Sequence, residues 1–352
     1  MEPKKVAVLF GGVSSEHEVS RLTAASVLKN LDRALWEPVP VGITKEGRWL
    51  LYRGPVEAIP DGSWEKDPGC VPAVLSPDRG HRGLLMENGE RIEVDVVFPA
   101  LHGKNGEDGT VQGLAALAGI PCVGCGVLSS ALCMDKDMTK RVLADHGIPH
   151  APGFSVTPED RDDAALAERI PKTLGWPVFV KPACAGSSVG VSRVEGPEEL
   201  PAALDTAFRE DRKVIIEEAI QGAEVECAVM GNFTDIFVAQ SLGEIVPKRG
   251  LYDYEGKYLD GSTDLYIPAR ISQRQAEVIR ETALKAYRVL GCTGLARVDF
   301  FVTKYECILN EVNTLPGFTD ISMYPKLMMA SEMSYAELLT RLLRLAVELG
   351  GQ

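Results

Sequence analysis

The residues best suited to chemistry lie in the segment 297–313, RVDFFVTKYECILNEVN, which reads as two strands around a short polar turn. If Thr303 and Cys307 flank a three-residue turn, alternate side chains of the two strands meet on one face of the antiparallel pair. That face then carries two opposed pairs: Arg297 opposite Asn313, and Asp299 opposite Glu311. A slip of one residue would put the two acids on opposite faces.

Two carboxylates opposed at ~5 Å repel each other unless a cation lies between them. Carboxylate and amide oxygens suit Mg²⁺, which keeps several waters and shares the phosphates of a substrate. The segment therefore predicts a phosphate-bridging metal site at Asp299, Glu311 and Asn313. A solvated hairpin face on which Arg297 compensates the acids fits the residues equally well.

A loop of small residues, KPACAGSSVG, runs from Lys181 to Gly190. Its backbone N–H groups can approach an anion closely and Lys181 stands at the end of a strand, so the loop could close over ATP phosphates. It is not the GxxxxGK[ST] P-loop, and an ordinary hairpin loop explains it as well. GGVSSE, which begins at Gly11, is not GxGxxG, and this argues against a dinucleotide-binding fingerprint.

Two further segments follow strands and could contact a ligand. His102 begins HGKNGEDG after a buried strand, at the carboxyl edge where open α/β sheets bind ligands, although a lone histidine is usually structural. The segment 216–220, IEEAI, ends a strand whose edge could offer backbone hydrogen bonds to adenine, with Glu224 toward a ribose. Taken alone, it is hardly distinguishable from a strand edge with solvated acids.

The elements that must position these residues begin with an α/β part. From Lys5 to Leu101 short apolar strands alternate with helical patterns, which predicts an N-terminal doubly wound parallel-sheet domain. Ser15 and Glu18 match a capping box at the start of its first helix. Glu16 is therefore expected at a helix N-terminus, beside exposed backbone N–H groups.

The rest of the chain is expected to be α+β. Helices are predicted from about 129 to 146 and from Thr157 to about Gly175, and the strands that follow should be antiparallel. Residues 249–264, RGLYDYEGKYLDGSTD, are too polar for a core and too long for a turn, so they are a lid candidate. Two late helices have capping pairs: Ser272 with Gln275, and Ser334 with Glu337.

Composition excludes several classes of protein. The 352 residues carry 50 Asp and Glu against 37 Lys and Arg, a formal charge of −13, and no basic stretch suited to nucleic acid or anionic membrane. No apolar run approaches ~20 residues and no signal peptide is visible. The eight cysteines are spread through apolar contexts, which indicates a reduced, cytoplasmic protein, and the Cys-x-x-Cys at 122–125 has no partner at zinc spacing.

Seven motifs in order over nearly the whole chain resemble the D-alanine-D-alanine ligase family: GGVSSEHEVS, LHGKNGEDGTVQG, MDK, KPACAGSSVGVS, YDYEGKY, RVDFF and NEVNTLPGFTDISMYP. The resemblance implies a two-part ATP-grasp fold after the N-terminal domain, with domains at 1–130, 131–212 and 213–352. It also implies that ATP phosphorylates the carboxylate of one D-alanine, and that the amine of a second attacks the acyl phosphate.

The resemblance also assigns roles to residues. Those expected to bind ATP are Lys136, Lys181, Ser187, Glu217, Glu218, Ala219, Ile220, Glu224, Lys257, Phe301 and Asn310. Those expected to act in catalysis are Glu16, Ser187, Tyr258 and Arg297. Those expected to border the D-alanines are Glu16, Val19, His102, Gly317, Ser322 and Met323. Two Mg²⁺ or Mn²⁺ ions are expected on Asp299, Glu311 and Asn313.

Other functions remain open at this point. Related ligases take D-lactate or D-serine second, although the intact YDYEGKY with Tyr258 favours D-alanine. Another ATP-grasp carboxylate-amine ligase would share the metal hairpin but not GGVSSEHEVS. A non-catalytic nucleotide-binding regulator should lack a metal ligand or Arg297, and here none is missing. The family further implies a homodimer that supplies peptidoglycan synthesis.

Overall fold

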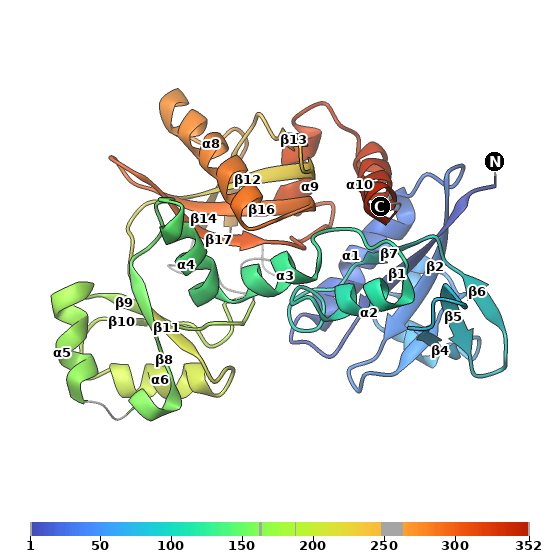
Figure 1. Ribbon diagram of the computed structural model, residues 1–352, viewed down its shortest axis with the longest axis horizontal. Coiled ribbons are helices and arrows are strands. Elements are labelled where there is room, and N and C mark those ends of the chain that lie inside the picture. Colours follow the sequence, from blue (N-terminus) through green and yellow to red (C-terminus); the bar gives the residue numbers. More distant parts are fainter. Residues whose placement is uncertain (1, 162–163, 187, 248–262, 351–352) are drawn as a thin grey trace.

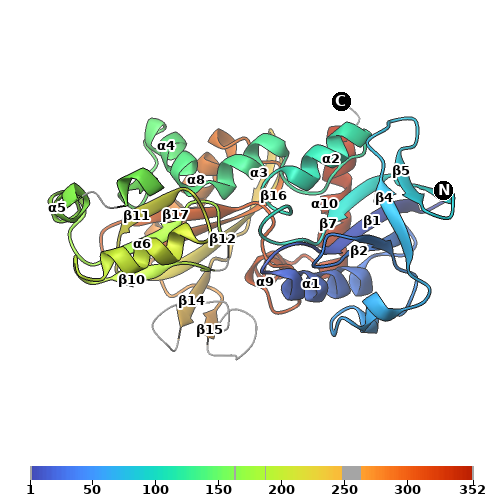
Figure 2. The same cartoon turned by 90° about the horizontal axis from the view of Figure 1, so that it is seen from below.

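The computed structural model describes residues 2–161, 164–186, 188–247 and 263–350. Ser187, Lys257, Tyr258 and nearly all of the expected lid at 249–264 lie outside the described residues. The N-terminal and four-stranded sheets lie at opposite ends of the molecule, with a six-stranded sheet between them (Figures 1 and 2). No described helix is both long and apolar enough to cross a membrane.

The N-terminal sheet is mixed, with strand order β6-β5-β4-β3-β2-β1-β7. β1 pairs in parallel with β2 and β7, as the alternating pattern predicts. From β2 to β6 each strand pairs antiparallel with the next one in the chain. The antiparallel extension is a correction to the doubly wound parallel sheet. The elements are β1 (Lys4–Gly11), α1 (His17–Asn30), β2 (Trp36–Ile43), β3 (Trp49–Leu51), β4 (Val71–Leu75), β5 (Gly83–Met86), β6 (Arg91–Glu93), β7 (Val96–Pro99) and α2 (Thr110–Ala118).

The start of α1 differs from the prediction. Glu16 occupies the N-cap position, but no side chain caps the helix, so the Ser15–Glu18 capping box is wrong. Ser14 instead accepts a hydrogen bond from the Glu16 backbone N–H at 3.1 Å, and Glu18 pairs with Lys45. The carboxylate of Glu16 is therefore not used as a helix cap.

The middle of the chain forms a four-stranded antiparallel sheet, β10-β9-β11-β8, with α5 and α6 packed on it. The single helix expected at about 129–146 is two helices, because Asp135 ends α3 and caps α4 by accepting a hydrogen bond from the Met138 N–H. β11 begins past the expected boundary at 212 and still pairs with this sheet. The elements are α3 (Val127–Met134), α4 (Lys136–Asp145), β8 (Gly153–Val156), α5 (Ala164–Thr173), β9 (Val178–Pro182), β10 (Ser192–Val194), α6 (Leu200–Phe208) and β11 (Val214–Glu218).

The C-terminal part is an antiparallel sheet in the order β15-β14-β12-β16-β17, with β13 also on β12, and α8 packs on one face. The predicted capping box of Ser272 and Gln275 is present at α8. α9 and α10 share one hydrophobic core with β1, α1 and β7 of the N-terminal part. The elements are β12 (Ala223–Asn232), β13 (Asp235–Val238), β14 (Gly243–Pro247), β15 (Thr263–Tyr266), α8 (Gln273–Val289), β16 (Gly294–Val302), β17 (Cys307–Asn313), α9 (Met323–Met329) and α10 (Tyr335–Gly350).

Candidate functional site

The hairpin of β16 and β17 has the predicted pairing of its polar residues, but for a different reason. Arg297 lies opposite Asn313 and Asp299 opposite Glu311. The turn is tighter than expected, because Val302 pairs with Cys307 and the Thr303 N–H donates to the Glu306 carbonyl. A β-bulge at Asn310, between the Asp299–Glu311 and Phe300–Leu309 pairs, inserts one residue and restores the predicted register.

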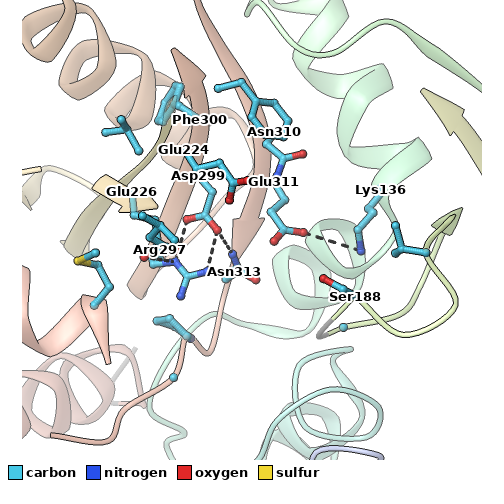
Figure 3. A pocket seen from close by; sticks show the side chains of 18 of the residues that line it. Lys136, Ser188, Glu224, Glu226, Arg297, Asp299, Phe300, Asn310, Glu311 and Asn313 are labelled. Atoms are coloured by element: carbon cyan, nitrogen blue, oxygen red, sulfur yellow. Dashed lines mark hydrogen bonds and ion pairs between the residues drawn. The ribbon is translucent and has the colours of Figure 1, made fainter. Parts of the chain in front are cut away.

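Arg297 is the cation at the centre of this hairpin face. Its Nε and terminal nitrogen donate to the two carboxylate oxygens of Asp299 at 2.8 and 2.7 Å. The Asn313 amide donates to one of the same oxygens at 2.9 Å (Figure 3). Arg297 Nε also lies 3.1 Å from a carboxylate oxygen of Glu226 on β12. A bidentate pair and a second acid together hold the guanidinium in one orientation.

Glu226 was missed by the sequence analysis. It is buried, and it lies directly opposite Asp299 in the β12–β16 register. A signal was available, because Glu224 and Glu226 alternate with the buried Val225 and Cys227, so both acids must lie on one face of the strand.

A cavity of about 870 Å³ opens over this face and draws its lining from all three parts of the chain. Figure 3 looks into it, with Lys136 and Ser188 across from the hairpin. The predicted residues that line it are Glu16, His102, Lys136, Lys181, Ala219, Ile220, Glu224, Arg297, Asp299, Phe301, Asn310, Glu311, Asn313, Gly317, Ser322 and Met323. Val19, Glu217 and Glu218 are described but are not among the lining residues.

Glu217 is buried beneath the cavity between two lysines. Its carboxylate lies 2.7 Å from Lys181 Nζ and 3.1 Å from Lys140 Nζ. Burial acts to raise the pKa of Glu217, but the two lysines outweigh it and lower that pKa to about 2. Burial lowers the pKa of Lys140, whereas Glu217 overcomes the same effect and raises the pKa of Lys181. Lys140 was missed, although it follows Lys136 by four residues and so shares its helix face.

Lys136, the first residue of α4, connects two sides of the cavity. Its Nζ donates to the Ala185 carbonyl at 2.7 Å, in the loop of small residues after β9. The same nitrogen lies 3.9 Å from a Glu311 carboxylate oxygen (Figure 3). A cation here is therefore in reach of both the predicted phosphate loop and the predicted metal hairpin.

Glu16 and His102 close the N-terminal side of the cavity. Glu16 is buried against two glycines: a Cβ at Gly103 or Gly186 would lie 2.5 or 2.6 Å from its carboxylate oxygen and would displace it. Gly103 also has a positive φ of 67°, which favours glycine there. His102 Nε2 lies 2.8 Å from the Thr23 hydroxyl and its Nδ1 lies 3.3 Å from the Leu315 carbonyl. Burial acts to lower the pKa of His102, but the neighbouring Glu107 outweighs it, and the pKa is raised.

The segment before α9 supplies the remaining lining. The Ser322 hydroxyl accepts a hydrogen bond from the Thr319 N–H at 3.0 Å and lies 2.8 Å from the Thr319 hydroxyl. Met323 is buried against Gly243, where an added Cβ would lie 2.2 Å from its sulfur. Gly317 borders the same part of the cavity.

The sequence and structure of the chain are similar to those of known proteins. The family models for the D-ala D-ala ligase N-terminus and C-terminus match residues 5–125 and 142–344. The chain is 49% identical to the D-alanine--D-alanine ligase of Caldicellulosiruptor bescii, over 99% of this chain and 96% of the relative. The solved VanG D-Ala:D-Ser ligase from Enterococcus faecalis is 42% identical with a TM-score of 0.89, covering 98% of this chain and 99% of that one. The D-alanine-D-alanine ligase from Coxiella burnetii is 34% identical with a TM-score of 0.86, covering 99% and 96%.

Proposed function

The chain belongs to the D-alanine-D-alanine ligase family, and from this membership we propose that it joins two D-alanines, using ATP, through a D-alanyl phosphate. The product serves peptidoglycan synthesis, the role that the family implies. The observation that carries the proposal is the cavity in which Arg297, two opposed carboxylates and the lysines of two other elements meet.

The reaction needs positive charge where the phosphates of ATP approach the carboxylate of D-alanine. A carboxylate becomes a good electrophile only when one of its oxygens is part of a phosphate leaving group, and this requires two anions to approach each other. Lys136 and Lys181 stand where they can bind the phosphates of ATP. Ala219 and Ile220 lie at the strand edge proposed for adenine, Glu224 is proposed for the ribose, and Phe301 and Asn310 border the same nucleotide.

Asp299, Glu311 and Asn313 fit two Mg²⁺ or Mn²⁺ ions. The two carboxylates are opposed across the hairpin, and Asn313 donates its amide N–H to Asp299, which leaves its amide oxygen as a ligand. The described residues hold no group of three His, Cys, Asp or Glu suited to a metal. The proposed ions would share phosphate oxygens with this hairpin and would neutralise charge on the transferring phosphoryl group.

The other side chains bind and orient the amino acids. Arg297 stabilises the transferring phosphoryl group and the tetrahedral intermediate that follows. Glu16 accepts the ammonium of the first D-alanine, which His102 and Gly317 border. The Ser322 hydroxyl donates to the carboxylate of the second, beside Met323. Val19 is buried in α1 and would support Glu16 from behind the cavity wall.

The three remaining members of the proposed site, Ser187, Lys257 and Tyr258, lie outside the described residues. Ser187 and Tyr258 would join Glu16 in a hydrogen-bonded triad, and Lys257 would contact phosphate. The Glu217 carboxylate is held by two lysines, so Glu217 and Glu218 are proposed to contact the nucleotide through their backbone.

The test is to incubate the protein with ATP, Mg²⁺ and D-alanine, follow phosphate release, and identify the products by mass spectrometry. D-serine, D-lactate and L-alanine are each supplied beside D-alanine. We expect the D-alanine dipeptide. A mixed product would favour the second candidate, a D-alanine-D-serine ligase, which the similarity to the Enterococcus faecalis structure supports. The absence of ATP turnover would contradict both.

We further propose a cytoplasmic homodimer, with domains at 1–130, 131–212 and 213–352, where β11 (Val214–Glu218) pairs with the sheet of the second domain. The expected boundary at 130 falls between the residues matched by the two family models. Analytical ultracentrifugation of the purified protein tests the dimer, and a single species with the mass of one chain would contradict it.

A further inference from the structure

Three carboxylates form a row across neighbouring strands in the wall of the cavity. Glu226 on β12 lies opposite Asp299 on β16, and Asp299 lies opposite Glu311 on β17. Arg297 contacts the first two, with its Nε shared between Asp299 at 2.8 Å and Glu226 at 3.1 Å (Figure 3). The mechanism above gives a role to every member of this group except Glu226.

The contacts of Arg297 conflict with the role proposed for Asp299. Both carboxylate oxygens of Asp299 accept hydrogen bonds from Arg297. A cation on Asp299 would take up lone pairs of these oxygens and repel the guanidinium, so the contact between Arg297 and Asp299 must weaken when the metal binds. The side chain of Arg297 is only 15% exposed, and a buried guanidinium that leaves one anion needs another.

Glu226 is that second anion. Its side chain is 4% exposed and it is held in the middle of β12, with buried residues on both sides. We propose that Glu226 is a positioning residue that retains Arg297 in the cavity while Asp299 turns to the metal. This inference rests on the proposed metal site and extends it to Glu226, for which we propose contact with Arg297 and not with the metal.

The amide of glutamine has the shape of glutamate but not its charge, so Glu226→Gln isolates this function. In that variant Arg297 loses its ion pair with Glu226 and stays on Asp299, where it competes with the cation. The matched control is Glu244→Gln on β14. Glu244 is a similarly buried acid that receives two side-chain hydrogen bonds from Arg270, at 2.9 and 2.8 Å, and it does not line the cavity.

The experiment measures Mn²⁺ affinity by electron paramagnetic resonance in the presence of ADP, without D-alanine and without turnover. Glu226→Gln should weaken Mn²⁺ binding about tenfold, because the buried ion pair between Glu226 and Arg297 is lost. Glu244→Gln should leave it unchanged. Adding Arg297→Ala to Glu226→Gln should restore the wild-type affinity, because the competitor for Asp299 is gone.

Each other outcome overturns a defined part. Wild-type affinity in Glu226→Gln overturns the positioning role. Equally weak binding in Glu226→Gln and the double variant also overturns it, because Glu226 would then act on the metal without Arg297. A wild-type protein that binds no Mn²⁺ removes the metal site itself. None of these depends on which amino acid is ligated, so failure of the D-alanine assignment is detected separately.

Discussion

Two buried ion clusters lie beside the same cavity with opposite charge ratios. In the first, which we name the lysine cluster, one carboxylate, Glu217, lies between Lys140 and Lys181. It joins the four-stranded sheet to α4, and its contacts carry one positive charge in excess. Lys181 brings that excess to the cavity wall, where the phosphates of ATP are proposed.

The second, the arginine cluster, reverses the ratio. One guanidinium, Arg297, lies between Asp299 and Glu226, and its contacts carry one negative charge in excess. It belongs to the six-stranded sheet, where the metal is proposed. Neither cluster is electrically neutral, although both are buried. Each keeps an excess charge opposite in sign to the ligand proposed beside it.

Replacing the central residue of the lysine cluster should have the largest effect. Glu217→Gln leaves two buried lysines without a counter-charge, so we expect a loss of about 3–5 kcal/mol in the free energy of unfolding. Urea denaturation of the ligand-free protein measures it. The control is Glu168→Gln on α5, whose exposed carboxylate pairs with Lys172. Equal losses in the two variants would show that burial of the lysine cluster does not make Glu217 essential for stability.

Replacing the central residue of the arginine cluster should act on rate instead. Arg297→Ala removes the stabilisation of the developing charge, so kcat should fall by ~10²–10³. Phosphate release at saturating ATP and D-alanine measures it. Arg270→Ala, which breaks the similar pair with Glu244, is the control and should keep most of the activity. A decrease in kcat of less than about tenfold would remove Arg297 from the transition state.

Lowering the pH should reduce the free energy of unfolding through the lysine cluster. The lysines lower the pKa of Glu217 from 4.5 to about 2 against the effect of burial, which corresponds to roughly 3 kcal/mol of stability. Because the folded-state pKa is depressed, this stability is present above about pH 4.5 and is lost as pH falls toward 2. Unfolding free energy should therefore fall more steeply over that window in wild type than in Glu217→Gln. Parallel curves would contradict the assignment.

The smallest expected effect comes from the lysine that does not reach the cavity. Lys140→Met leaves Glu217 paired with Lys181 but removes the excess charge, so KM for ATP should rise about tenfold while kcat changes much less. Steady-state kinetics measures both constants. Lys172→Met removes the same charge from an exposed position on α5 and should leave KM unchanged. An unchanged KM in Lys140→Met would show that the lysine cluster is only structural.

Most of the predicted site residues that the structure describes line the cavity, because short motifs carry them. The hairpin shows the limit of such reasoning. The pairing of Asp299 with Glu311 is confirmed, yet the assumed turn was one residue too long and the bulge at Asn310 corrected it. A bulge inserts a residue without a distinct sequence signal here, so periodicity alone could not reveal it.

Contacts between residues far apart in the chain could not be predicted either. Lys140 and Glu217 are far apart in the chain, and only the packing of α4 on β11 brings their charges together. β3 to β6 are short and variable in pattern, so their antiparallel pairing could not be distinguished from the parallel pairing of β1 with β2 and β7. The capping box at Ser15 failed because the Ser14 hydroxyl bonds to the Glu16 backbone instead.

The core that α10 shares with the N-terminal part has a consequence for biosynthesis. β1 and α1 are translated well before α10, whose Leu338 and Leu342 share their hydrophobic core. The apolar face that α10 covers is therefore exposed until α10 has left the ribosome, and the N-terminal sheet cannot complete its packing before then. Chaperone binding to this face of the nascent chain is expected to persist for the same period.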